Sequence, residues 1–377
     1  MTWDHPRGLA PLVALSTRDE GPPGTTVQWS ARSLQAFADH PLEDLVEDFD
    51  LLVIDHPHIP LVADEDLLVR LDGCGHDDEL ALLARQSVGS SHASYRHGGH
   101  QYGLAIDAAA QVSVHRPDLL LGELPSSWPE VLDLARQGKV LWPGKPVDAM
   151  SSFLTLSAQM GEEVCSRDGL FVTNETGLAV LDLLHRLVDR VGPECLAYNP
   201  IDVAERLSTT DEHCYAPLAF GYVNYSRAGF RPHRLAYRDM PAGNRGTAGS
   251  CLGGAGIAVS TRCVDEQAAV TYAFWLAGGT LQRDRYYWDG GQPANALAWE
   301  DAAINDDSLS FFAATRSTLE GASVRPRHPG WITLQESVGE LVHGALSGTM
   351  GDEACLKALD AERGRHMGGE GGNGDYF

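Results

Sequence analysis

The spacing of apolar residues along the chain predicts alternating strands and helices. Leu51 to Ile54 is an unbroken apolar run that ends in polar residues and a proline, as a buried parallel strand does. Between residues 173 and 191, leucines and valines recur at intervals of three and four, which predicts an amphipathic helix. Segments of both kinds follow one another in each half of the sequence, so we expect an α/β protein.

A glycine-rich segment late in the chain combines the two patterns. Residues 252–260 join glycines to β-prone side chains, and residues 264–276 continue with apolar side chains at helical spacing. Gly253 and Gly254 lack a Cβ atom, so either a ligand or another backbone segment can approach them closely. We take both glycines as candidate ligand contacts and keep the packing alternative open.

The other elements are predicted from shorter patterns and from residues that begin or break helices. Further strands are expected over residues 26–30, 101–116, 140–143 and 214–225. Further helices are expected over residues 9–15, 41–49, 131–136, 149–160, 199–207, 296–304, 308–318, 334–346 and 352–363. Residues 364–377 are rich in glycine and are expected to form a disordered tail.

The composition narrows the range of partners and compartments. The 377 residues carry a formal net charge of −24 and the isoelectric point is about 4.9, which argues against nucleic acid and anionic membranes as partners. No apolar run has the length of a membrane span. The first residues have neither the basic nor the apolar part of a signal peptide. We expect a cytoplasmic protein as the sequence is written, and an extracytoplasmic one if the true start lies upstream.

Cysteines and histidines give no sign of a metal site. The seven cysteines have no disulfide or zinc spacing and are expected to be reduced, buried thiols. His56 and His58 lie two positions apart after an apolar run, but two histidines need a third ligand to hold a metal. We therefore expect no metal and no other cofactor.

Five motifs follow one another in a recognisable order. They are Gln101 to Asp107, Pro125 to Glu130, Leu252 to Val259, Tyr272 to Leu276 and Gln282 to Pro293. Together they resemble the first crossing segment, the helix start after it, and the return strand with its following helix and loop in the family 1 extracellular solute-binding proteins. Those proteins are the receptor components of carbohydrate ABC importers, and the resemblance covers roughly residues 3–363. The chain departs from the family pattern at Ala105 and Asp107, where many members have proline or apolar residues.

The resemblance implies a two-lobed, periplasmic-binding-protein-like (type II) α/β fold with hinge crossings. Lobe one would take residues 1–107 and 250–322, and lobe two residues 108–249 and 323–363. A small-molecule ligand, a sugar or a sugar acid, would lie between the lobes and be enclosed by hinge closure. The implied macromolecular partner is the permease of an ABC transporter, and we expect the protein itself to be a monomer.

Sugar recognition requires flat apolar faces for C–H groups and polar groups for hydroxyls. The aromatic candidates are Trp3, Trp29, Tyr102, Trp142, Tyr222, Tyr225, Tyr287 and Trp288. The polar candidates are His5, Arg7, His56, His58, Asp107, Lys145, Asp148 and Asn224. Core packing is the commoner role for any single aromatic residue, but Tyr287 and Trp288 lie in a glycine-bounded loop without an obvious core.

Arg7 is the candidate that bears on the charge of the ligand. It lies in the turn that begins a helix, where a guanidinium can hold a carboxylate or a phosphate. With Lys145 opposite, it would favour a sugar acid or a small organic acid. The alternative for Arg7 is an ion pair within this acidic protein.

Two further functions use the same fold. A cytoplasmic enzyme on this scaffold would act on a small polar metabolite, with Cys251 or Cys214 as nucleophile and Asp55, Asp107 or a histidine as base. A cytoplasmic sensor would bind a ligand and report to a partner protein. Neither has a motif of its own in the sequence, so ligand binding for transport is our main prediction.

Overall fold

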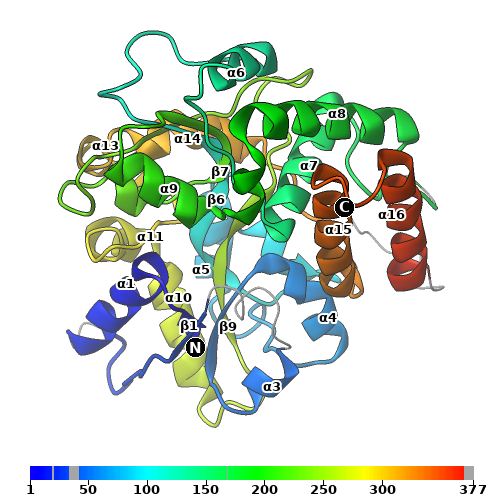
Figure 1. The fold of residues 1–377 in the computed structure, drawn as a ribbon. Helices are drawn as coiled ribbons and strands as arrows, with labels where there is room; N and C mark the ends of the chain where they lie inside the picture. The colour runs from blue at the N-terminus through cyan, green and yellow to red at the C-terminus, as the bar shows by residue number, and fades with distance from the viewer. Residues whose placement is uncertain (19–20, 34–41, 168, 369–377) are drawn as a thin grey trace.

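A computed structural model describes residues 1–18, 21–33, 42–167 and 169–368 of the protein (Figure 1). Its centre is a five-stranded sheet in the order β3–β9–β6–β7, with β8 also paired to β6. The strands are β3 (Leu51–Ile54), β9 (Leu252–Val259), β6 (Leu104–His115), β7 (Tyr215–Phe220) and β8 (Ala236–Arg238). The pairings between these strands are antiparallel.

The strand β6 belongs to both halves of the molecule. Residues 104–110 pair with β9, whereas residues 111–115 pair with β7 and β8. The register shifts between Ala105 and Asp107 and again between Val112 and Val114, as happens at β-bulges, where strands bend. One continuous strand therefore links the two lobes, which occupy the lower and upper parts of Figure 1.

The first lobe is built on β3, β9 and the first half of β6. Apolar side chains on both faces of these strands are buried, because helices and loops cover both sides of the sheet. Other described elements of this lobe are β1 (Thr2–Trp3), α1 (Pro6–Thr17), β2 (Ala31–Arg32), α3 (Glu43–Val46), η1 (His56–His58), α4 (Ile59–Asp64), α5 (Asp77–Arg85), η2 (Ala93–Tyr95), β4 (Arg96–His97), β5 (His100–Gln101) and α10 (Glu266–Ala277).

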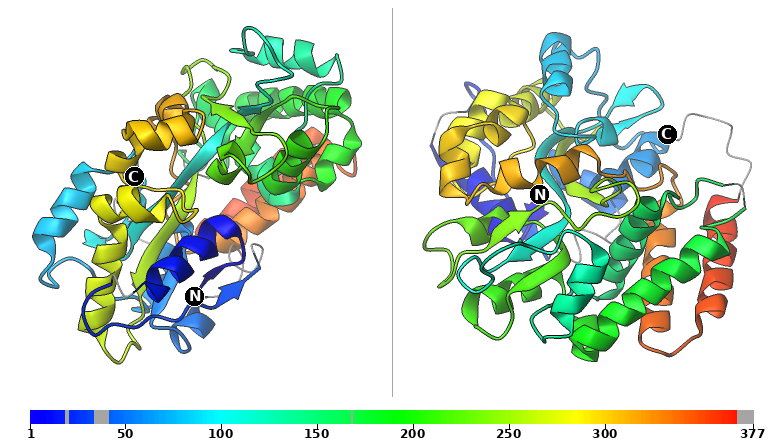
Figure 2. Two further views of the ribbon diagram at one scale, coloured as in Figure 1. Left: turned by 90° about the vertical axis from the view of Figure 1, so that its left-hand side faces the viewer. Right: turned by 90° about the horizontal axis from the view of Figure 1, so that it is seen from above.

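The second lobe is mainly helical around β7, β8 and the end of β6. Its larger core includes Phe153, Leu184 and Trp331. Figure 2 shows α15 and α16 beside α7 and α8 in both views, as their contacts require. The helices are α6 (Trp128–Ala135), α7 (Pro146–Met160), α8 (Asn174–Val191), α9 (Pro200–Thr209), α15 (Trp331–Leu346) and α16 (Asp352–Met367), with the short turn η4 (Val223–Ser226) after β7.

Several local predictions differ from the structure. The buried run at β3 is a strand, but its ladder partner β9 is antiparallel, not parallel. Residues 26–30 and 140–143 form no strand of their own; Val140 makes a single bridge to Tyr215. The helix expected over residues 296–304 is two short helices, because Asp301 caps a new one. Residues 364–367 of the expected tail belong to α16, and residues 369–377 lie outside the described part of the chain.

The position of the segment after α10 bears on the predicted lobe division. It contains α11 (Gly279–Leu281), η5 (Gln282–Tyr286), α12 (Ala296–Trp299), α13 (Ala302–Asp307) and α14 (Phe311–Glu320). Tyr286 packs in a core of the first lobe, whereas Tyr287 packs with Phe311, Phe312 and the end of β6. We therefore propose a division between Tyr286 and Tyr287 instead of after residue 322. The other predicted boundaries stay predictions.

Gly254 is required where β9 passes β6. Its φ is +113°, and a Cβ atom there would lie 2.3 Å from the carbonyl oxygen of Asp107. We expect Gly254→Ala to lower the free energy of unfolding by about 2–5 kcal/mol, because it adds backbone strain to a clash with backbone. Gly364→Ala in α16 is the control, since its Cβ meets nothing within 4 Å and alanine favours a helix. Urea unfolding of both variants tests this, and equal stabilities would contradict it.

Candidate functional site between the lobes

A buried ion pair lies where the lobes meet. Arg7, in the first turn of α1, donates from Nε and Nη2 to the two carboxylate oxygens of Asp107 on β6, at 2.7 and 2.6 Å. Its Nη1 donates to the carbonyl oxygen of Gly221, just after β7, at 2.8 Å. Burial opposes the charged form, but the Asp107 carboxylate outweighs it and raises the pKa of Arg7. Arg7 therefore ties α1 of the first lobe to a loop of the second.

Aromatic rings cover this ion pair. The Arg7 guanidinium lies over the ring of Tyr222, 4.4 Å from its centroid, and the His5 ring meets the same tyrosine edge-on at 5.0 Å. His5 also caps α1, because its Nδ1 accepts a hydrogen bond from the backbone N–H of Arg7 at 3.1 Å. Burial, assisted by the charge of Arg7, lowers the pKa of His5 to about 4, so its imidazole is neutral at pH 7.

Two buried acceptors nearby have no partner among the described residues. Asn224 donates from Nδ2 to the carbonyl oxygen of Gly290 at 3.1 Å, while its Oδ1 is unpaired. Asp148, in the first turn of α7, is 4% exposed, and its Oδ2 is unpaired. Burial raises the pKa of Tyr222, and the negative charge of the ionised Asp148 carboxylate adds to this rise. We call His5, Arg7, Asp107, Asp148, Tyr222 and Asn224 the Tyr222 cluster.

The charge state of Asp148 follows from its surroundings. Burial raises the pKa of its carboxyl to about 8; Lys145 opposes this rise and Asp202 adds to it. Lys145 contacts Asp202 at 3.3 Å, and both side chains are 43% exposed, so the lysine is not a dedicated partner of Asp148. A hydrogen-bond donor that reaches a buried, unpaired carboxyl stabilises it.

A second polar group lies at the end of β3. Asp55 caps η1 and accepts a hydrogen bond from Nη2 of Arg325 at 2.6 Å. His56 is 1% exposed, meets Tyr95 edge-on, and has an unpaired Nε2 within the described chain. Burial lowers the pKa of His56 to about 4, and the nearby Arg325 adds to this effect. This group holds the segment that leads from α14 to α15 against the first lobe.

The predicted contact residues fall into two sets. The structure brings together His5, Arg7, Asp107, Tyr222 and Asn224, with Asp148 close enough to act on Tyr222, and it places His56 and His58 in η1. Six aromatic candidates lie elsewhere: Trp3, Tyr102, Trp142, Tyr225 and Tyr287 are buried in hydrophobic cores, and Trp29 packs beside Tyr272. Trp288 is 44% exposed and leans on Tyr287. We do not include these seven in the proposed site.

The glycines and the basic residues have structural partners. A Cβ at Gly253 would meet the ring of Phe220, and one at Gly254 the Asp107 carbonyl, so both glycines admit protein instead of a ligand. Arg7 is engaged by Asp107 and Lys145 by Asp202. The argument for an acidic ligand therefore loses its basis.

The thiols named for the enzyme alternative are not activated. Cys214 and Cys251 are buried, and burial raises the pKa of each. An activated cysteine requires the opposite shift. No observation in the site therefore favours that alternative.

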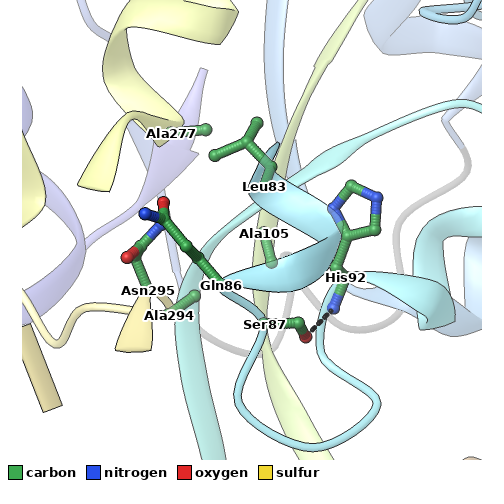
Figure 3. A pocket seen from close by; sticks show the side chains of 8 residues that line it. All are labelled: Leu83, Gln86, Ser87, His92, Ala105, Ala277, Ala294 and Asn295. Carbon is green, nitrogen blue, oxygen red and sulfur yellow. Dashed lines mark hydrogen bonds between the residues drawn. The ribbon is translucent and has the colours of Figure 1, made fainter. Parts of the chain in front are cut away.

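A small cavity lies at Ala105 of β6 (Figure 3). Its volume is about 10 Å³, enough for a single water molecule. Leu83, Ala105 and Ala277 line it, and Ser87 Oγ accepts from the backbone N–H of His92 at 3.1 Å nearby. It lies within the packing of α5, α10 and β6, so it is not a sugar site.

Two features are missing from the residues that the structure describes. They contain no group of three or more histidine, cysteine or acidic side chains that could hold a metal ion. In the same ranges, no helix combines the length and apolar character of a membrane span. The chemistry available to the Tyr222 cluster is thus hydrogen bonding, ion pairing and aromatic contact.

Sequence reasoning missed Arg325. It lies in an Arg-Pro-Arg-His-Pro stretch whose composition predicts a linker-like turn, yet it is 8% exposed and paired with Asp55, 270 residues away. Two prolines indicated an irregular segment, but a buried partner leaves no local signal. A basic residue inside an irregular, apolar-flanked segment is the only hint that the sequence offers.

Comparison with known proteins identifies the class of protein. The family model described as bacterial extracellular solute-binding protein matches residues 31–313. The match spans well over half of the chain, so the protein belongs to this family. This confirms the family resemblance inferred from the five motifs. A search of curated protein sequences gives no significant match.

Solved structures show the same fold. Three of them are maltose-bound MalE3 of T. maritima (17% identity, 93% of this chain and 94% of that one, TM-score 0.80), a solute-binding protein of Agrobacterium radiobacter K84 in complex with ribitol (19%, 96% and 96%, 0.80), and the GacH receptor of Streptomyces glaucescens (15%, 100% and 98%, 0.80). At these identities the likeness concerns the fold. The predicted two-lobed, periplasmic-binding-protein-like fold is confirmed.

Proposed function

We propose that this solute-binding protein captures a sugar or polyol between its lobes, as a monomer, and presents it to the permease of an ABC importer. The Tyr222 cluster carries the proposal. It combines an aromatic ring with unpaired, buried acceptors at the boundary between the lobes. A polyhydroxylated ligand needs both: an apolar face for its C–H groups and acceptors for its hydroxyls. Similar structures were solved with maltose, ribitol and acarbose, which agrees with this ligand class.

Ligand binding is tested by thermal unfolding and calorimetry with maltose, ribitol, D-mannitol, tagatose and acarbose. A ligand present at 100 times its Kd should add about 2.7 kcal/mol to the free energy of unfolding, because it binds only the folded protein. We expect at least one member to do so and to be recovered unchanged. No stabilisation by any of these ligands or by an amino sugar or amino polyol would contradict the proposal, and so would consumption of the ligand.

A matched pair of variants locates the site. Asn224→Ala removes the unpaired Oδ1 in the cluster and should weaken binding of a hit about tenfold, the loss expected for one hydrogen bond of about 1–1.5 kcal/mol. Asn174→Ala makes the same change at an exposed position in α8 and should leave the affinity unaltered. Equal affinities of the two variants would place the ligand elsewhere.

A further inference from the structure

The basic side chains at the lobe boundary are paired with protein acceptors, whereas one acidic side chain there keeps an oxygen without a partner in the described ranges. Arg7 uses Nε, Nη1 and Nη2 on Asp107 and Gly221, Lys145 contacts Asp202, and Arg231 contacts Glu205 at 2.6 Å. The basic groups around the Tyr222 cluster are therefore already matched by protein acceptors. A ligand carboxylate would have to compete with these partners.

The acidic residue Asp148, unlike these basic residues, has an atom without a partner among the described residues. Asp148 is 4% exposed and lies in the first turn of α7, so its carboxyl is shielded from water. Its Oδ2 has no partner in the described part of the protein, and the only basic residue that acts on it, Lys145, is shared with Asp202. A buried carboxyl without a partner is costly unless something supplies a hydrogen bond or an opposite charge.

The unpaired atom of Asn224 is, like that of Asp148, an oxygen that accepts hydrogen bonds. Because Asn224 Nδ2 is used by the carbonyl oxygen of Gly290, the atom that it leaves unpaired is the acceptor Oδ1. A ligand that reaches either position must thus supply a donor there. An ammonium group offers three donors and a positive charge, whereas a hydroxyl offers one donor and a carboxylate none.

We propose that the ligand carries a cationic amine that pairs with Asp148, so that the protein selects amino sugars or amino polyols over neutral ones and excludes sugar acids. This inference rests on the proposed function and narrows its ligand class. Pairing an ammonium with a buried carboxylate forms a charge-assisted hydrogen bond, which is about twice as strong as a neutral one. Tyr222 and the neutral His5 line the same boundary without adding a competing positive charge.

The pairing implies a proton balance. In the free protein at pH 7, the Asp148 carboxyl holds a proton, since its pKa is about 8. The charged groups that act on it are Lys145, just before α7, and Asp202 on α9, and Asp148 in turn acts on Tyr222, just before η4. A protonated amine that binds there requires the carboxylate, so one proton leaves Asp148 for the solvent on binding. The affinity for an amine should therefore rise about tenfold between pH 6 and pH 7.

The test uses two matched triads on the full-length protein. The ring triad is glucose, glucosamine and glucuronate; the open-chain triad is sorbitol, glucamine and gluconate. Calorimetry at pH 7 should find an amine that binds at least tenfold tighter than its neutral counterpart and at least a hundredfold tighter than the acid. The difference between the binding enthalpies measured in two buffers of different ionisation enthalpy should correspond to one proton released for each amine bound.

Variants connect the preference to one side chain. Asp148→Asn should bring the ratio of amine affinity to neutral affinity close to one and abolish the proton release. Asp182→Asn, which removes the same charge from an exposed position on α8, should keep both. If Asp148→Asn does not fold, the buffer titrations on the unmodified protein still decide the matter.

The outcomes separate this inference from the proposed function. A neutral or acidic member that binds at least as tightly as its amine overturns the inference and leaves sugar binding standing. The same holds if neither triad binds while maltose, ribitol or another member of the first panel does. If no sugar, polyol or amine binds at all, both proposals fail.

Discussion

Arg7→Ala is expected to lower the free energy of unfolding by about 3–5 kcal/mol, because it leaves the Asp107 carboxylate buried without a partner. The same substitution removes the hydrogen bond to Gly221 and the contact with Tyr222. Urea unfolding at pH 7 measures the loss. The variant also unties α1 from the second lobe, so its ligand affinity should fall together with its stability.

The same helix provides the control for Arg7. Arg18, at the end of α1, makes a two-pronged pair with Asp289 at 2.6 Å; its own side chain is 42% exposed, whereas that of Asp289 is 9% exposed. Because solvent reaches and screens the guanidinium, Arg18→Ala should cost less than Arg7→Ala, about 1–2 kcal/mol. The double change Arg7→Met with Asp107→Leu should recover much of the loss, since it removes both buried charges. A loss in Arg7→Ala no larger than in Arg18→Ala would contradict the argument.

Acid is expected to destabilise the protein strongly between pH 7 and pH 5. Burial, assisted by neighbouring arginines, lowers the pKa of four histidines to about 4: His5, His56, His92 and His115. The unfolded chain takes up a proton at each near pH 6.5, whereas the folded protein does so only near pH 4. Their stabilisation is therefore complete above pH 6.5 and is lost as the pH falls, on the order of 2 kcal/mol each by pH 5.

One carboxyl acts in the opposite direction. The pKa of Asp148 is raised to about 8, so its cost to the folded state shrinks as the pH falls and offsets roughly one histidine. The net loss between pH 7 and pH 5 should be on the order of 5 kcal/mol. Urea unfolding at pH 7, 6 and 5 gives the slope. His56→Gln and His115→Gln should each reduce the slope by the contribution of one proton taken up on unfolding. A free energy of unfolding that does not change between pH 7 and pH 5 would refute the prediction.

The sequence predicted those parts of the fold whose patterns are local. The helix expected over residues 173–191 is found at Asn174–Val191, because one amphipathic stripe with a threonine cap defines it. The glycine-rich strand and the helix after it are found at β9 and α10, because their patterns are also local: glycines with β-prone residues, then an apolar run that Asp265 caps and Gly278 ends. The partner of β3 was not predictable, since its strand neighbour β9 lies about 200 residues away.

The candidate site was predicted only as a set of residue types. Arg7 and Asp107 were both candidates, but nothing in the sequence indicates that they neutralise each other across 100 residues. The glycines that bound its loop predict no core around Tyr287, yet Phe312 from α14 packs against it, with the ring centroids 5.8 Å apart. The unpaired state of Asp148 is likewise a property of packing, because it depends on which donors fail to reach the carboxyl.

The continuity of β6 restricts how the lobes move relative to each other. Residues 104–110 and 111–115 form one strand, which is hydrogen-bonded to β9 in one part and to β7 and β8 in the other. Sliding one lobe past the other would break hydrogen bonds in both ladders at once. Rotation about the bulges near Ala105 and Val112 bends the strand and preserves them. We therefore expect the lobes to move mainly by bending and twisting of β6 at these bulges, which would open and close the boundary at Tyr222.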